Sequence, residues 1–316
     1  MQLKLKLMNK PAEKINFRAL GTDIYAEIVF GAAEEREKAK ADLMTLESLY
    51  RAKQKIFCRF WPESELSQLN KNLKRFNKAS QDILYLAGRA LFYWQASGGL
   101  YDPRIIEILE KIGYQKDFRG SDFSKMKISE NFDKIESDLN DNLKIKNGKI
   151  FFGRRMDFSG IAKGYITDLG AKFLKKRGWR NFLVDSGGDV FAAGENVNGE
   201  KWRIATEGVP EKKLMLNISD KGIATSGISR KKWEIGGKKF HHLINPKNPS
   251  YFSHELRTVS VIEKNTENAD GRAKVLVLLG KEKGMKFAKK NKIAAVFLDY
   301  KGNIFASPEA KQYLAI

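Results

Sequence analysis

The feature that most constrains the fold is a run of short strand-like segments in the second half of the chain. They cover residues 202–205, 214–218, 222–226, 232–235 and 241–244. Such segments indicate antiparallel hairpins, and helices occur beside them without the strand–helix–strand alternation of a parallel sheet. The sequence therefore predicts an α+β fold, a single domain in which helices pack on a mixed, largely antiparallel sheet.

Apolar spacing and capping residues predict the helices. Leu43, Leu46 and Tyr50 mark one buried stripe of a long helix over residues 32–57. Ser80 begins a second helix, which ends at Gly98-Gly99. The remaining predicted helices cover residues 101–113, 165–177, 269–279 and 282–291. Residues 17–30 are predicted to form one strand, or two strands with a kink at Gly21. The other predicted strands cover 149–152, 180–190 with an interruption at 186–189, 256–262 and a closing hairpin at 294–306.

Two segments are expected to lie outside the main fold. Residues 1–16 are polar and lysine-rich, and we expect a loosely held arm before a domain that spans residues 17–316. Residues 115–148 are poor in apolar periodicity, which indicates a polar surface insertion. The N-terminus lacks an apolar core of signal-peptide length, and no apolar run is long enough to cross a bilayer. We therefore expect a cytoplasmic protein on the sequence as given, or a periplasmic or membrane-anchored one if an export signal was removed.

The charge balance suggests two classes of partner. The chain has 58 basic and 38 acidic side chains, a formal net charge of +20. One reading is a polyanionic partner such as a nucleic acid. The favoured reading is a lysine-rich soluble surface, because the lysines are scattered and no nucleic-acid-binding signature accompanies them. Cys58 is the only cysteine, so the chain forms no internal disulfide or cysteine-based metal site. The oligomeric state is left open.

Residues 157–168, with the sequence DFSGIAKGYITD, suit an anionic ligand. Asp157 precedes a glycine-containing turn, and Lys163 is expected at the mouth of the following helix. Backbone N–H groups and the helix dipole favour an anion at such a helix start, and the lysine adds a full charge. A short Gly-Lys pattern is weak support by itself.

Further segments support this interpretation of residues 157–168. In their order and spacing, these segments together resemble the ApbE family of FAD:protein FMN transferases. The similarity covers nearly the whole chain from about residue 17. The matching segments are LGT at residues 20–22, CRFWP at 58–62 followed by 64–70, GLYDP at 99–103, residues 157–168 with SGGD at 186–189, ATSG at 224–227 with residues 241–246, and ADG at 269–271.

The resemblance implies a reaction and a set of site residues. Members of the family bind FAD with a Mg²⁺ ion on its diphosphate, move FMN onto a Thr or Ser of a partner protein, and release AMP. His242 matches the histidine near the transferred phosphate, and the metal set falls on Gly160, Asp270 and position 274, here Lys274. The implied flavin pocket comprises Leu20, Leu100, Tyr101, Asp102, Asp157, Lys163 and Ile244.

The metal helix departs from the family pattern. Asp270 is retained, but Ala273 and Lys274 stand where the family has oxygen donors. An ammonium repels Mg²⁺, which prefers oxygen ligands. One hypothesis is that Lys274 pairs with Asp270 and puts its own charge where the metal would sit. The alternative is an ordinary exposed helix ion pair, worth under about 1 kcal/mol. Asn245 also replaces a family aspartate.

These departures leave two functional hypotheses. The first is an FMN transferase with an altered metal site. The second is an FAD-binding member with a degraded metal site, which performs no transfer or hydrolyses FAD slowly. Residue-level alternatives also stand: His242 as a structural histidine, Tyr101 as a core residue, Asp157 as a turn cap and Asp168 as a helix-packing residue. Salt-sensitive nucleic-acid binding is a third, minor hypothesis.

Overall fold

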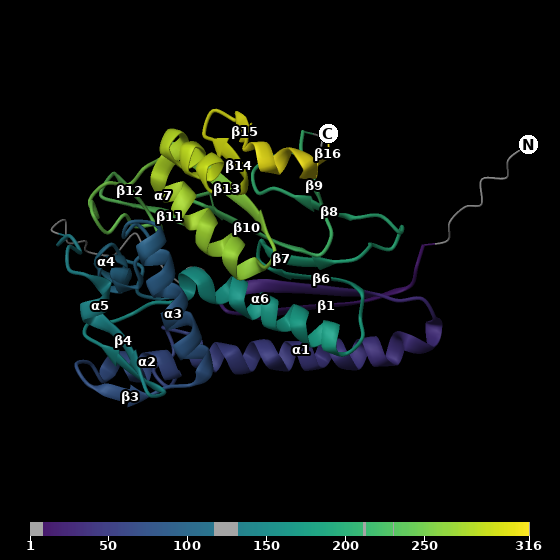
Figure 1. Cartoon of the computed structure of the whole chain (residues 1–316), viewed down its shortest axis with the longest axis horizontal. Coiled ribbons are helices and arrows are strands. Elements are labelled where there is room, and N and C mark those ends of the chain that lie inside the picture. Colours follow the sequence, from purple (N-terminus) through teal and green to yellow (C-terminus); the bar gives the residue numbers. More distant parts are fainter. Residues whose placement is uncertain (1–8, 117–131, 211–212, 230, 316) are drawn as a thin grey trace, which may run out of the picture.

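The computed structural model describes residues 9–116, 132–210, 213–229 and 231–315, and an eight-stranded sheet forms its centre (Figure 1). Every neighbouring pair in this sheet is antiparallel, which confirms the predicted fold class. The strand order is β1 (Ala12–Ala19), β2 (Thr22–Val29), β6 (Asn181–Ser186), β7 (Asp189–Ala193), β10 (Lys221–Gly227), β13 (Leu256–Glu263), β14 (Ala294–Asp299) and β15 (Ile304–Ala306).

Three helices cover one face of this sheet: α1 (Arg36–Phe57), α6 (Ser159–Lys176) and α7 (Thr266–Lys290) (Figure 1). Helices α6 and α7 approach very closely at Gly164, where an added Cβ would lie 2.7 Å from the carbonyl oxygen of Thr266. Asp168 ties the two helices together, because its carboxylate accepts the backbone N–H groups of Thr266 (2.7 Å) and Glu267 (2.9 Å). This places the N-terminal half of α7 rigidly beside the start of α6.

A smaller sheet covers the opposite face. It contains β8 (Trp202–Ala205), β9 (Met215–Ile218) and β16 (Leu314–Ala315), in the order β16-β9-β8. Its Leu216 and Ile218 pack with Ile223 and Val296 of the central sheet. Because both faces are covered, β14 is buried along its whole length, as its continuous apolar sequence requires.

The remaining helices and strands cluster at one end of the molecule (Figure 1). Within the described ranges, no helix is long and apolar enough to span a membrane. Short 3₁₀ turns are η1 (Ala33–Glu35), η2 (Pro103–Ile105) and η5 (Pro308–Tyr313). The helices and strands of this end are α2 (Glu65–Lys71), α3 (Gln81–Ala96), α4 (Ile106–Lys111), α5 (Leu139–Asn142), β3 (Phe76–Lys78), β4 (Leu143–Lys146), β5 (Lys149–Phe152), β11 (Lys232–Ile235) and β12 (Lys238–His241).

Two predictions about the outlying segments need correction. The arm predicted over residues 1–16 is wrong for residues 12–16, which belong to β1 and pair with β2; residues 1–8 lie outside the described part of the chain. The polar insertion predicted near 115–148 is wrong for its last ten residues, because Leu139 and Leu143 are buried in the main core. Residues 117–131 of that segment are not described. Each prediction missed a short apolar or alternating stretch within a lysine-rich sequence.

One predicted helix start is wrong, and two predicted interruptions are confirmed. The helix expected from residue 165 begins at Ser159, so Gly160 and Lys163 lie inside its first turns. The interruption expected at 186–189 is the turn of a hairpin between β6 and β7, at Gly187-Gly188. The break expected between the helices over 269–279 and 282–291 is a kink within α7 at Gly280 (φ 74°, ψ 179°).

Candidate active site

A cavity of about 320 Å³ opens where the helical face meets the turns of the central sheet. Its walls come from the β1–β2 turn, the C-terminal end of α1, the start of α6, the end of β10, the segment after β12, and α7. Asp270 alone among the predicted site residues is not in the lining; it lies 1% exposed behind Lys274. The predicted site residues that line the cavity are Leu20, Leu100, Tyr101, Asp102, Asp157, Gly160, Lys163, His242, Ile244 and Lys274.

The β1–β2 turn presents Leu20 to the cavity in a left-handed backbone conformation. Leu20 (φ 54°) and Gly21 (φ 70°) are the two central residues of a two-residue hairpin, in which Ala19 pairs with Thr22. Positive φ at both positions is the signature of a type I′ turn. The turn is fixed by Gln54, whose side-chain oxygen accepts the Leu20 N–H at 3.1 Å. A leucine in this conformation is strained, which is common at ligand sites.

Asp157 is held by Arg59, a partner that the sequence did not suggest. The Arg59 Nε and Asp157 Oδ2 atoms lie 3.2 Å apart, and the two side chains are 4% and 3% exposed. The other carboxylate oxygen, Oδ1, accepts the Ser159 N–H at 2.8 Å, so Asp157 also caps the first turn of α6. The capping interpretation of Asp157 is therefore correct, and its side chain still lines the cavity.

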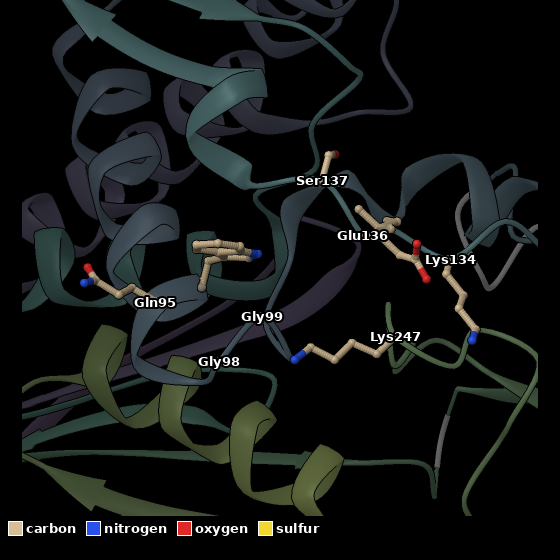
Figure 2. A pocket seen from close by; sticks show the side chains of 9 residues that line it. Gln95, Gly98, Gly99, Lys134, Glu136, Ser137 and Lys247 are labelled. Atoms are coloured by element: carbon tan, nitrogen blue, oxygen red, sulfur yellow. The ribbon is translucent and has the colours of Figure 1, made fainter.

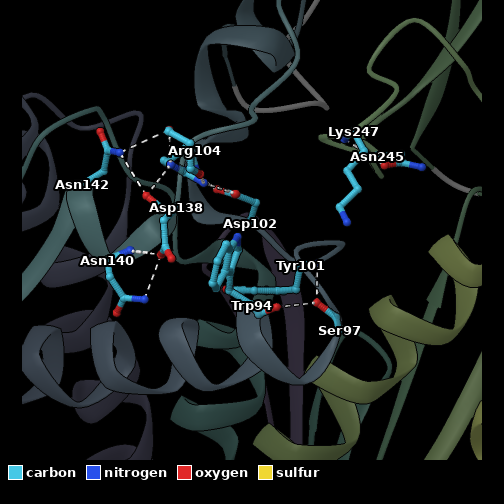
Figure 3. A network of polar contacts seen from close by, with 11 residues as sticks. Trp94, Ser97, Tyr101, Asp102, Arg104, Asp138, Asn140, Asn142, Asn245 and Lys247 are labelled. Carbon is cyan, nitrogen blue, oxygen red and sulfur yellow. Dashed lines mark hydrogen bonds and ion pairs between the residues drawn. The ribbon is translucent and has the colours of Figure 1, made fainter.

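Asp102 is also locked in a buried arginine pair (Figure 3). Arg104 donates to Asp102 from Nε (3.0 Å) and Nη2 (2.7 Å), and both side chains are at most 1% exposed. Arg104 also donates to the Ser137 hydroxyl and carbonyl oxygens, both at 2.9 Å. This network fixes the 101–104 segment between the cavity and the 137–142 segment.

A second cavity, of about 530 Å³, lies next to this segment on the side of Gly98 and Gly99 (Figure 2). Lys247 reaches toward Gly99 in this view, and a Cβ placed on Gly99 would lie 3.4 Å from Lys247 Cε and from Trp94 Nε1. The glycine is required here by its positive φ of 85°. The rest of the lining is Gln95, Lys134, Ile135, Glu136 and Ser137.

Lys163 lies in the second turn of α6 and is already paired. Its Nζ donates to Asp189 Oδ2 at 2.6 Å and contacts the Ser186 carbonyl oxygen at 3.4 Å. Burial lowers the pKa of Lys163, but the Asp189 and Asp270 carboxylates outweigh it and raise the pKa above its ordinary value. Burial and Asp270 raise the pKa of Asp189, against the attraction of Lys163. Lys163 was predicted at the mouth of the helix, and the structure places it in the second turn instead. Its side chain still lines the cavity.

Asp270 and Lys274 form an ion pair one helical turn apart on α7. Asp270 Oδ2 also accepts the Gly164 N–H of α6 at 3.3 Å. The pair is not the exposed helix pair considered as an alternative, because the Asp270 and Lys274 side chains are 1% and 16% exposed. Gly160 lies alongside: a Cβ placed there would lie 3.1 Å from Tyr101 Cε2 and 3.6 Å from Lys274 Cε. The three residues predicted as a metal set are thus brought together.

The donor set at this point does not suit Mg²⁺. Mg²⁺ needs several oxygen ligands in octahedral geometry. Asp270 is occupied by an ammonium, and the neighbouring Ala273 presents a fully buried methyl group. Across the described ranges, no three His, Cys, Asp or Glu side chains gather as a metal-ligand group.

His242 lines the cavity just after β12, and its orientation fixes its tautomer. Its Nδ1 lies 3.3 Å from the Lys231 carbonyl oxygen, which can only accept a hydrogen bond. Nδ1 therefore carries the proton and Nε2 carries the lone pair. Burial, Lys231 and Lys274 lower the pKa of His242 well below its ordinary value, so the ring is neutral at pH 7.

Two hydroxyl groups complete the polar lining. The Tyr101 and Ser226 hydroxyls are buried and have no hydrogen-bond partner among the described residues. Such unpartnered groups are rare in native proteins and mark places where a ligand or water belongs. No ligand role was expected for Ser226, and Arg59 and Asp189 stood in quoted motifs without a role of their own. The partners of Arg59 and Asp189, which are Asp157 and Lys163, are distant in sequence, so no spacing signal could have identified these two pairs.

Comparison with known proteins gives the same picture. The ApbE family model matches residues 20–297. An FAD:protein FMN transferase of Haemophilus influenzae is 27% identical over 264 residues, 79% of this chain and 76% of that protein. One of Vibrio cholerae is 34% identical over 147 residues, 45% of this chain and 44% of that protein.

Solved structures share the fold over almost the whole chain. The ApbE protein of Thermotoga maritima superposes with a TM-score of 0.81 at 18% identity, covering 96% of this chain and 99% of that one. The flavin transferase ApbE of Vibrio cholerae gives a TM-score of 0.76 at 22% identity, covering 96% and 100%. With the family match spanning most of its length, this chain belongs to the ApbE family.

Proposed function

We propose that this protein is an FAD:protein FMN transferase, which moves FMN from FAD to a Thr or Ser hydroxyl of a partner protein and releases AMP. The observation that carries the proposal is the convergence on one cavity of the residues that match the family's flavin pocket, together with His242. The family match and the curated relatives, all named for this reaction, support it.

The lining is divided in a way that suits the two parts of FAD. Leu20, Leu100, Tyr101 and Ile244 supply apolar and aromatic surface for a flavin ring, and the Tyr101 hydroxyl is an unsatisfied hydrogen-bonding group. The ammonium groups of Lys163 and Lys274 supply positive charge for phosphate oxygens. The Asp102 and Asp157 carboxylates support these walls through their arginine pairs.

The chemical step requires positioning and charge neutralisation more than covalent work by the protein. The acceptor hydroxyl oxygen attacks the phosphorus of the FMN half and forms a new P–O bond. The bond from that phosphorus to the bridging oxygen breaks, and AMP leaves with the bridging oxygen. We assign the hydroxyl proton to His242 Nε2, because its neutral ring holds a lone pair there while Nδ1 binds the Lys231 carbonyl.

FAD is the substrate in this proposal, and Mg²⁺ takes no part in it. Magnesium, when bound in a suitable site, neutralises diphosphate charge. The residues that would hold it here are the Gly160 carbonyl and Asp270, and the second of these is paired with Lys274. The proposed partner is a protein that carries the Thr or Ser acceptor.

One observation favours the second hypothesis, FAD binding without transfer. An ammonium in place of a divalent ion supplies half the charge at the reacting diphosphate. Weaker charge neutralisation lowers the rate of phosphoryl transfer, since electrostatic stabilisation is its main catalytic term. The two hypotheses therefore share the binding site and differ in turnover.

The test is FMN transfer measured as covalent flavin fluorescence on threonine- and serine-containing acceptors, with AMP release followed in parallel. We expect His242→Asn to lower the transfer rate by about 10²- to 10⁴-fold while the dissociation constant for FAD changes by less than about threefold. His254→Asn, at an exposed histidine of the same region, is the matched control and should leave the rate unchanged. AMP release without covalent flavin would show that the protein hydrolyses FAD and does not transfer FMN. Absence of FAD binding would contradict both the transferase hypothesis and the FAD-binding hypothesis.

A further inference from the structure

The further inference rests on the proposed function and concerns how FAD is held. We propose that the Lys274 ammonium is a built-in cation for the FAD diphosphate, so that this protein binds FAD without a divalent metal ion. Lys274 is then a binding residue that touches the substrate. The argument uses the geometry of α6 and α7, the oxygen donors available, and the charge of the cavity.

The Lys274 side chain is positioned where a phosphate can reach it. It lines the cavity and is 16% exposed, whereas the carboxylate of Asp270 beneath it is 1% exposed. Its Cδ and Cε atoms lie beside Gly160, at 3.5 and 3.6 Å from a Cβ placed there. Because Gly160 has no side chain, the lysine runs across the first turn of α6 with its ammonium group at the cavity. A Cβ at residue 160 would only touch this stem, and its tighter contact, at 3.1 Å, would be with Tyr101 Cε2.

Asp270 holds the lysine in place instead of holding a metal ion. Its two oxygens bind the Lys274 ammonium and the Gly164 N–H. The buried methyl group of Ala273 offers nothing to a metal, and the nearby Asp189 is bound to Lys163. Within the part of the chain that the structure describes, no third carboxylate or imidazole joins Asp270 to form a metal-ligand group. The two carboxylates beside this point, Asp189 and Asp270, are thus each already paired with a lysine.

The charges around the cavity support the same conclusion. Lys163, Lys274, Asp189 and Asp270 interact as one group, because each lysine acts on the Asp189 carboxylate and Asp270 acts on both Asp189 and Lys163. Lys163 and Lys274 both line the cavity, and each is held by a buried aspartate, so the wall presents two ammonium groups to it. Two ammonium groups match the two negative charges of a diphosphate, each through a charge-assisted hydrogen bond.

The first experiment measures FAD binding to the full chain in EDTA and in millimolar MgCl₂, with metal content determined on the purified protein. We expect less than about one bound divalent ion per ten molecules and dissociation constants for FAD that agree within about twofold. An FAD affinity that falls about tenfold or more in EDTA, corresponding to about 1.4 kcal/mol, overturns the inference. FAD binding would persist in that outcome, so the proposed function would stand.

The second experiment removes the lysine. Lys274→Met alone strands the buried Asp270 carboxylate, so the informative variant is the double change Asp270→Asn with Lys274→Met, which removes both charges together. We expect its dissociation constant for FAD to rise about tenfold with no rescue by MgCl₂. Lys283→Met, at an exposed lysine on the same helix, is the control and should bind FAD like the wild type. Unchanged FAD binding by the double variant overturns the inference.

The third experiment attempts the reverse exchange. Ala273→Asp with Lys274→Thr supplies oxygen donors at the two positions that lack them and frees Asp270. We expect this variant to bind FAD weakly in EDTA and to regain affinity with MgCl₂. The FAD affinity of the wild type should change with neither EDTA nor MgCl₂. If the wild type fails to bind FAD in every buffer, both the proposed function and this inference are wrong. If the wild type binds FAD but these variants behave otherwise than expected, only the assignment of Lys274 is wrong.

Discussion

The cavity has two charged walls that are built in different ways. On one wall, Arg59–Asp157 and Arg104–Asp102 are buried pairs in which neither partner is more than 4% exposed. On the other wall, Lys163–Asp189 and Lys274–Asp270 pair buried aspartates, each 1% exposed, with lysine side chains that are 24% and 16% exposed. The arginines are fully enclosed by protein, and the lysines keep an open side toward the cavity.

The two kinds of ion pair differ in role: the arginine pairs are structural, and the lysine pairs can bind a ligand. A guanidinium with its donors shared among a carboxylate, a carbonyl and a hydroxyl has little capacity left for a ligand, as Arg104 shows. A lysine ammonium has three donors on a flexible stem and can add a phosphate oxygen to an existing partner. We therefore interpret the arginine wall as the part that holds the 101–104 and 157–159 segments in place, and the lysine wall as the part that meets the anionic ligand.

The largest effect is expected from breaking the arginine wall. Arg104→Ala should lower the free energy of unfolding by about 3–5 kcal/mol, because it leaves the Asp102 carboxylate buried without its partner. Urea denaturation followed by fluorescence measures this change. Arg155→Ala is the control, since the Arg155–Glu110 pair is 35% and 30% exposed and should cost at most about 1 kcal/mol. Equal losses in the two variants would remove the distinction between buried and exposed pairs.

A smaller stability effect and a larger binding effect are expected from the lysine wall. Lys163→Met should lower the free energy of unfolding by less than about 2 kcal/mol, because burial already favours protonated Asp189 and the carboxylate can take up a proton. The dissociation constant for FAD should rise about tenfold, as expected for one lost charge-assisted hydrogen bond. Lys172→Met, at an exposed lysine of α6, is the matched control. A stability loss as large as that of Arg104→Ala would contradict the contrast between the walls.

The smallest effect concerns the base of the lysine wall, where Asp168 caps α7. Burial raises the pKa of Asp168 to about 6 from an ordinary value of 3.8, against the backbone N–H groups of Glu267 and Thr266, which lower it. A carboxyl whose folded pKa is raised binds its proton more tightly in the folded state. Its contribution to stability is therefore greatest below pH 4 and is lost as the pH rises through 6.

Asp168→Asn removes this titration and keeps one oxygen acceptor for the helix start. Relative to the wild type, we expect the variant to gain about 1–2 kcal/mol in unfolding free energy on going from pH 4.5 to pH 7. The buried histidines His241 and His242 have lowered pKa values, so their contribution to stability rises with pH, opposite to that of Asp168. Both proteins contain these histidines, so their contribution cancels when the two proteins are compared at each pH. A difference that stays constant with pH would show that Asp168 titrates normally.

Local patterns in the sequence predicted most of the fold and the membership of the site. The apolar stripe of α1, the Ser80 cap of α3 and the closing hairpin all lie where spacing predicted them. Ten predicted site residues line the cavity, and all of them belong to short sequence motifs that indicate their chemistry. Asp168 was expected to support helix packing, but the sequence did not show which helix it contacts, because its partners at the start of α7 lie about 100 residues later in the chain.

The sequence by itself determined the fold class, the family and the residue types that gather at the site. Periodicity, caps and turn residues act over a few neighbouring positions, and so they are readable along the chain. Only the tertiary structure decided which charges meet: Arg59 with Asp157, and Lys163 with Asp189. The physical reason is that ion-pair energies depend on distance and burial, and both are set by packing between distant segments. The same packing decided that Lys274 lies at the cavity over a buried Asp270 and is not an ordinary surface lysine.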